Sequence, residues 1–110
     1  MSELIIKENP TLPDFQKYAT DMESQRGFQD ETIIEQCLLL GEEVGELFKA
    51  VRKNNTTLSF DNKNSKAKDV ANELADIMIY LFCISNRLGI DLEKAIRDKE
   101  EINKKRIWEK

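Results

Sequence analysis

Apolar residues recur at steps of three and four along residues 33–51, a spacing that places them on one face of a helix. The members of this face are Ile33, Cys37, Leu40, Val44, Leu47 and Val51. Asp30 precedes the run and is of a residue type that caps helix N-termini. The sequence therefore predicts a long amphipathic helix that begins after Asp30 and ends near Lys53.

An earlier helix is outlined by its start and stop signals. Thr11 and Asp14 have the spacing of a capping box, and Pro13 lies near the first helical position. Gly27 is a suitable stop, because glycine adopts the left-handed conformation that ends many helices. These signals predict a helix over residues 12–26.

Two more helices are expected in the second half of the chain. Residues 54–66 are rich in Asn, Ser and Thr and have no sustained period, which predicts a loop. A third helix is expected over residues 67–88, before Gly89. Asp91 can cap a fourth helix that ends near residue 107, with basic side chains in its last turns as the helix dipole favours.

Length and composition indicate one all-α domain that covers residues 1–110. The chain is 40% hydrophobic and 35% charged, with only four Gly and two Pro, which favours long helices over strands and turns. The net charge of -4 disfavours binding to a nucleic-acid polymer or an anionic membrane. With no histidine in the chain, acid-base chemistry must come from carboxylates, amines and hydroxyls.

The segment IMIYLFCI, residues 77–84, is apolar on every side of its helix. A small monomer has too few elements to cover such a helix, so we expect a homo-oligomer in which helices of two chains pack together. The apolar run is too short to cross a membrane, and the N-terminus has no signal-peptide pattern, so we expect a soluble, cytoplasmic protein. Cys37 and Cys83 lie in apolar segments and are expected to be buried thiols.

Two acidic groups carry the functional signal. Glu42, Glu43 and Glu46 lie within a turn and a half of the long helix, and Glu73 and Asp76 share one face of the next. That second face continues into apolar residues, so its carboxylates lie at the edge of a core, where they need a compensating cation. If the two helices are antiparallel neighbours, their oxygens could form a site for Mg²⁺ or Mn²⁺, of the kind that handles phosphates. Nearby lysines and arginines could also supply the cation.

The segments GEEVGEL, NELADIMIYL, LGIDLEKAI and DKEEINKKR follow one another in an order that resembles the MazG-like nucleotide pyrophosphohydrolases. These belong to the all-α NTP pyrophosphohydrolases, with the dimeric dUTPases and dCTP pyrophosphatases. The resemblance covers residues 11–108. It implies a four-helix bundle completed by homo-oligomerisation, as a homodimer or a dimer of dimers.

The resemblance also implies roles for particular residues. The implied ligands of Mg²⁺, with Mn²⁺ as a possible substitute, are Glu43, Glu46, Glu73 and Asp76. Glu42 and Glu43 are the implied catalytic carboxylates, one of which would activate water. The residues matched to nucleotide contacts in the last helix are Lys99, Asn103 and Arg106, and Phe28 is a candidate to stack on the base.

The implied reaction converts a nucleoside triphosphate and water into the monophosphate and pyrophosphate. Deoxynucleotides such as dCTP or dATP are the expected substrates, in a house-cleaning role. Two alternatives remain open at the level of sequence. The chain could be a non-catalytic helical interaction module whose acidic groups form salt bridges, or a pyrophosphohydrolase of another phosphorylated metabolite such as phosphoribosyl-ATP.

Overall fold

The computed structural model describes residues 3–53 and 65–108, and in these ranges the chain is helical with no strand. The all-α prediction is therefore confirmed. The elements in chain order are α1 (Leu12–Arg26), the 3₁₀ turn η1 (Phe28–Asp30), α2 (Ile33–Lys53), α3 (Ser65–Arg87) and α4 (Leu92–Lys104).

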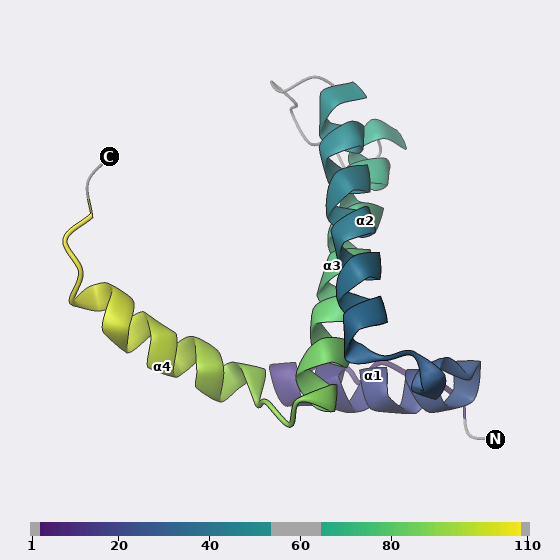
Figure 1. Cartoon of the computed structure of the whole chain (residues 1–110), viewed down its shortest axis with the longest axis horizontal. Coiled ribbons are helices and arrows are strands. Elements are labelled where there is room, and N and C mark those ends of the chain that lie inside the picture. Colours follow the sequence, from purple (N-terminus) through teal and green to yellow (C-terminus); the bar gives the residue numbers. More distant parts are fainter. Residues whose placement is uncertain (1–2, 54–64, 109–110) are drawn as a thin grey trace.

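Helices α2 and α3 run antiparallel as a long pair, and α1 crosses their lower end (Figure 1). Helix α4 leaves this lower end and extends away from the pair, so that its packing within the chain is mainly against α1 (Figure 1). The chain is thus an open arrangement of helices, in which one pair carries both acidic segments.

The predicted caps of α1 are confirmed. The Thr11 hydroxyl accepts a hydrogen bond from the Asp14 backbone N–H, and the Asp14 carboxylate accepts one from the Thr11 backbone N–H. Gly27 ends the helix with a φ of 73°, a left-handed conformation that a residue with a Cβ adopts only at a cost.

The N-terminus of α2 differs from the prediction. Asp30 lies in the turn η1 and does not cap α2. The Thr32 hydroxyl accepts from the Glu35 backbone N–H at 3.1 Å, and the Glu35 carboxylate accepts from the Thr32 N–H at 3.4 Å. Because Thr32 and Glu35 satisfy each other's backbone groups as a capping box, the helix begins at Ile33.

The bounds of the last two helices also shift slightly. Helix α3 begins at Ser65, two residues before the predicted start, and the rest of the predicted loop, residues 54–64, lies outside the described residues. Asp91 caps α4 as predicted, through a hydrogen bond from the Lys94 N–H. Helix α4 ends at Lys104, three residues before the expected end.

A small core joins α1 to the C-terminal half of α3. Ala19 and Met22 of α1 pack with Phe82 and Cys83 of α3, and Phe15 stacks on Phe82 with ring centroids 5.5 Å apart. These contacts fix α1 across the end of the α2–α3 pair.

The buried Gln16 fixes the turn between α3 and α4. Its amide nitrogen donates to the Ser85 hydroxyl and to the Ile90 carbonyl, and its amide oxygen accepts from the Leu92 N–H. One side chain therefore sets the direction in which α4 leaves the bundle.

Much apolar surface is left uncovered within one chain. Ile34, Leu38 and Phe48 on α2 are each about two thirds exposed or more. Cys37 belongs to the same helix and is also exposed, so the prediction of two buried thiols is correct only for Cys83. The reason is that α3, the main neighbour of α2 within the chain, covers only one side of it. Among the described residues, no helix is both long enough and apolar enough to cross a membrane.

Candidate functional site

Three carboxylates from the two antiparallel helices converge between α2 and α3. Glu43 of α2 faces Glu73 and Asp76 of α3, and one oxygen from each lies within 4.8 Å of the others. Glu73 and Asp76 can both face Glu43 because they are three residues apart and so lie on the same face of α3. This is the only group of three or more potential metal-ligating side chains in the described part of the chain.

The group has the properties of a cation site. Glu43 and Glu73 are partly buried, and the Glu73 Oε2 atom is buried without a hydrogen-bond partner. Among the described side chains, those of residues 3–53 and 68–108, no lysine or arginine forms an ion pair with Glu43, Glu73 or Asp76. A buried oxygen without a donor is costly, and the all-oxygen set suits Mg²⁺ or Mn²⁺. The residues therefore fit such an ion.

The neighbouring carboxylates raise the pKa of Glu43. Its hydrogen bond with the Glu73 carboxyl raises its pKa from 4.5 to about 7, with further contributions from burial and from the charges of Glu73, Asp76 and Glu46. In the absence of a cation, a proton near neutral pH thus relieves part of the repulsion among these carboxylates. A divalent cation would compete with that proton.

The other two glutamates of the acidic segment lie beside the group. Glu46 is exposed and lines a neighbouring cavity of about 260 Å³ with Glu73 and with Lys49 and Lys53. Glu46 is not part of the three-carboxylate group, although its charge contributes to the raised pKa of Glu43. Glu42 is exposed on the surface of α2.

The predicted nucleotide-binding residues of the last helix are not brought to the acidic group within one chain. Helix α4 extends away from the α2–α3 pair (Figure 1). Lys99 is exposed there, and the Asn103 amide donates to Glu100 at 3.0 Å. The Arg106 guanidinium lies 4.4 Å from the centre of the Trp108 ring.

Phe28 lines a cavity of about 180 Å³ that also includes Asp76 of the acidic group. Sequence reasoning missed two buried polar residues in this cavity, Glu23 and Gln36, which are 5% and 1% exposed. For Gln36, the spacing of the residues around it could have revealed this. Gln36 lies three residues after Ile33 and four before Leu40, on the apolar face of α2, where a polar residue is unexpected.

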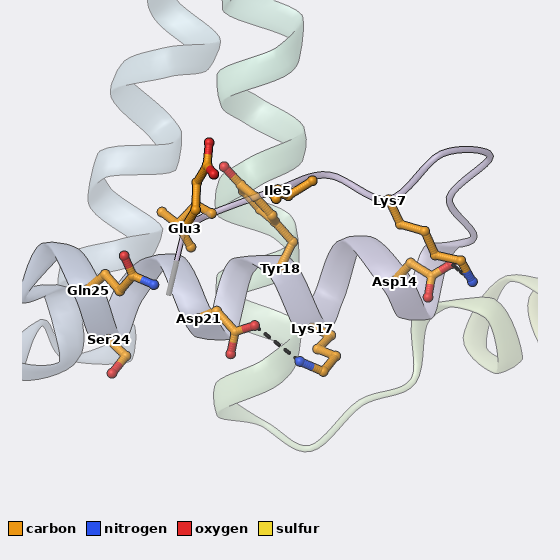
Figure 2. A pocket seen from close by; sticks show the side chains of 10 residues that line it. Glu3, Ile5, Lys7, Asp14, Lys17, Tyr18, Asp21, Ser24 and Gln25 are labelled. Carbon is orange, nitrogen blue, oxygen red and sulfur yellow. Dashed lines mark hydrogen bonds and ion pairs between the residues drawn. The ribbon is translucent and has the colours of Figure 1, made fainter. Parts of the chain in front are cut away.

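A larger cavity, of about 590 Å³, lies between the N-terminal segment and α1 (Figure 2), and none of the three converging carboxylates lines it. It is lined by surface side chains such as Lys17 and Asp21, which pair with each other at 3.2 Å one helical turn apart. Exposed pairs of this kind stabilise a helix slightly and indicate no ligand. The convergence of carboxylates, and not the size of the cavity, identifies the candidate site.

Comparisons with known proteins agree with this geometry. A family model described as the MazG nucleotide pyrophosphohydrolase domain matches residues 29–107, which include both acidic segments. A dATP/dGTP diphosphohydrolase of Salmonella phage PMBT28 is 33% identical over 100 residues, which make up 91% of this chain and 29% of that protein. The chain therefore spans less than a third of the length of this relative. Since the family model covers well over half of the chain, the protein belongs to the MazG nucleotide pyrophosphohydrolase domain family.

Proposed function

We propose that the protein hydrolyses nucleoside triphosphates to the monophosphate and pyrophosphate with the help of Mg²⁺, for which Mn²⁺ can substitute. The observation that carries this proposal is the convergence of Glu43, Glu73 and Asp76, whose oxygens lie within 4.8 Å of one another without an ion pair among the described residues. Glu46 would be the fourth ligand, since it lies three residues after Glu43 on α2 and its charge contributes to the raised pKa of Glu43. When bound, the cation would neutralise triphosphate charge and polarise the α-phosphoryl group.

The chain's own residues then have separate tasks. Glu43, Glu73 and Asp76 would hold the cation between the two helices and so fix the position of the triphosphate. Glu42 lies next to the group on α2 and is outside the set of three, so we assign it the role of accepting the proton of the attacking water. No histidine is available for this step.

The position of α4 leads us to propose that the site is completed by a second copy of the chain. Lys99, Asn103 and Arg106 would supply the positive charge and hydrogen bonds that a triphosphate requires, but α4 extends away from the acidic group of its own chain (Figure 1). In a homodimer or a dimer of dimers, α4 of one protomer would reach the acidic group of another. The exposed apolar side chains of Leu38 and Phe48 support such an assembly, because large apolar surfaces are usually covered by a partner.

Deoxynucleoside triphosphates are the proposed substrates. The relative from Salmonella phage PMBT28 is named a dATP/dGTP diphosphohydrolase, so dATP and dGTP are the first candidates for this chain. Removal of such nucleotides would constitute a house-cleaning role.

The test is pyrophosphate release from the four dNTPs and the four NTPs, with Mg²⁺ and with excess EDTA. We expect release from a subset of the dNTPs, and its loss in EDTA. If no nucleotide yields pyrophosphate with Mg²⁺ or Mn²⁺, the catalytic proposal is wrong, and a helical interaction module or another phosphorylated substrate becomes the better account.

A further inference from the structure

Several polar side chains line the cavity of about 180 Å³ that borders Asp76. Helices α1, α2 and α3 and the turn η1 all contribute to it, and the rings of Phe28 and Tyr80 line it. Gln36, which also lines this cavity, is 1% exposed, and its amide oxygen Oε1 has no hydrogen-bond partner. A buried acceptor left without a donor is rare in native proteins and costs free energy.

The orientation of the Gln36 amide is fixed by its neighbours. Its nitrogen donates to Glu23 Oε2 at 3.1 Å, and the same oxygen accepts from Arg87 at 2.6 Å. Because an ionised carboxylate only accepts hydrogen bonds, Gln36 must direct its NH₂ toward Glu23 and keep its oxygen on the other side. The unpartnered atom is therefore Gln36 Oε1, an acceptor that an N–H donor of a ligand could satisfy.

Of the other polar groups of the cavity, Arg26 only donates hydrogen bonds, and the Tyr80 hydroxyl can donate or accept. Glu31 and Asp76 contribute carboxylates, which are also acceptors. Burial, followed by the charges of Glu31, Glu43 and Asp76, raises the pKa of Tyr80, so that its hydroxyl stays protonated. A ligand that fits this cavity should therefore be flat enough to lie against aromatic rings and should present an N–H donor to Gln36 Oε1.

We propose that this cavity holds the nucleobase of the substrate and that Gln36 Oε1 accepts a hydrogen bond from it, which favours bases with an exocyclic amino group. Adenine, guanine and cytosine carry an amino group with two N–H donors. Thymine and uracil offer only one N–H, which is flanked by two carbonyl oxygens, so they have fewer donors to present to Gln36 Oε1. The inference rests on the proposed function, because it places the base beside the acidic group through Asp76.

Turnover tests this assignment. We expect kcat/KM for the best of dATP, dGTP and dCTP to exceed the values for dTTP and dUTP by roughly tenfold or more, because a site with an unpaired acceptor rejects a base that cannot satisfy it. Replacement of the acceptor in Gln36→Met should reduce this ratio to about twofold or less. A wild-type enzyme that prefers dTTP or dUTP, or a ratio that Gln36→Met leaves unchanged, would overturn the assignment.

Gln16→Met is the matched control. Gln16 is also a buried glutamine, but the hydrogen bonds of its amide are all made within the chain, to Ser85, Asn86, Ile90 and Leu92. The same substitution there should lower thermal stability and leave the ratio among the bases unchanged. A change of the ratio in this control equal to that in Gln36→Met would show that general destabilisation, and not the Gln36 acceptor, sets the preference.

Binding of monophosphates separates this inference from the proposed reaction, and it needs no variant. Calorimetric titration of the wild-type protein with dAMP, dGMP, dCMP and dTMP should show at least one amino-bearing nucleotide binding roughly tenfold more tightly than dTMP. Equal or tighter binding of dTMP would overturn the base assignment even if pyrophosphate is released. Selective binding without pyrophosphate release would support the base assignment and contradict the proposed reaction.

Discussion

Glu43 of α2 and Glu73 of α3 face each other across the antiparallel pair, and the interaction of their carboxyl groups is the largest cause of the raised pKa of Glu43, about 7. Two carboxyl groups that face each other without a cation can reduce their repulsion by holding a proton. A divalent cation would replace that proton and bring both oxygens into its own coordination. The metal-free and metal-bound forms should therefore differ in protonation near neutral pH.

Metal binding should release a proton and strengthen as the pH rises. Below the raised pKa of about 7, Mg²⁺ must displace the proton of Glu43, so its apparent affinity should fall with decreasing pH, by up to about tenfold per pH unit. Calorimetric titration in buffers of different ionisation enthalpy measures both the affinity and the released proton. Glu43→Gln should remove the pH dependence. An affinity that stays constant between about pH 6 and pH 8 would contradict this reading.

The same pKa has a consequence for stability without metal. Since the folded-state pKa of Glu43, about 7, lies above its ordinary value of 4.5, the folded state binds more protons than the unfolded state between these values. The stabilisation from Glu43 should be complete below about pH 4.5 and disappear as the pH rises through 7. Denaturant unfolding in EDTA at several pH values, compared with Glu43→Gln, measures this contribution. A wild-type and variant difference that is independent of pH would argue against the shared proton.

Glu42→Gln should separate proton transfer from metal binding. If Glu42 accepts the proton of the attacking water, its loss should lower kcat by roughly 10²-fold or more and leave Mn²⁺ affinity unchanged. Asp21→Asn, which removes an exposed carboxylate from α1, is the matched control and should retain full turnover. A parallel loss of Mn²⁺ affinity in Glu42→Gln would instead identify Glu42 as a metal ligand.

The ion pair between Glu23 and Arg87 should be important for stability. Arg87 is only one quarter exposed, and it also donates to the Glu31 and Phe28 carbonyls, so it ties α3 to η1 and to the start of α2. Arg87→Met would leave the buried Glu23 carboxylate without its cation, at a cost of roughly 3 kcal/mol in the free energy of unfolding. Lys94→Met breaks an exposed pair with Asp98 and should have no measurable effect. Equal losses in the two variants would refute this distinction.

Oligomer formation should depend on the exposed apolar face of α2. Leu38 is 67% exposed within one chain, and a charge placed there by Leu38→Glu should be incompatible with a buried apolar interface. Sedimentation equilibrium should give a multiple of the chain mass of 12.8 kDa for the wild type and a smaller species for Leu38→Glu. Ser24→Glu, at an exposed position of α1, is the control and should leave the assembly intact. A wild type that sediments as a monomer at micromolar concentration would contradict completion of the site by a second copy.

Local signals in the sequence predicted the local structure well. The capping box of Thr11 and Asp14 and the left-handed Gly27 were correct, because such motifs depend on a few adjacent residues. Asp30 failed as a cap because a second capping box, with Thr32, competed two residues later. The convergence of Glu43 with Glu73 followed from antiparallel pairing of two helices, which their spacing and the loop between them already favoured.

Properties that depend on long-range packing could not be predicted in the same way. The outward direction of α4 is set by Gln16, whose partners lie about 70 residues away in the sequence. The exposure of Cys37 reflects how much of α2 one chain can cover, which no local pattern specifies. The position of Gln36 on an apolar face could have drawn attention to it, but its unpartnered oxygen is evident only from the position of Glu23.

The most direct test of the account is Mn²⁺ binding and pyrophosphate release measured on the same samples of the wild type, Glu73→Gln and Asp76→Asn. Titration followed by electron paramagnetic resonance would give the Mn²⁺ affinity, and dATP would serve as substrate. We expect both variants to stay folded and to lose Mn²⁺ affinity and turnover together, each by roughly 10²-fold or more. Full Mn²⁺ affinity or full turnover in either variant would contradict the claim that the carboxylates between α2 and α3 hold the catalytic cation.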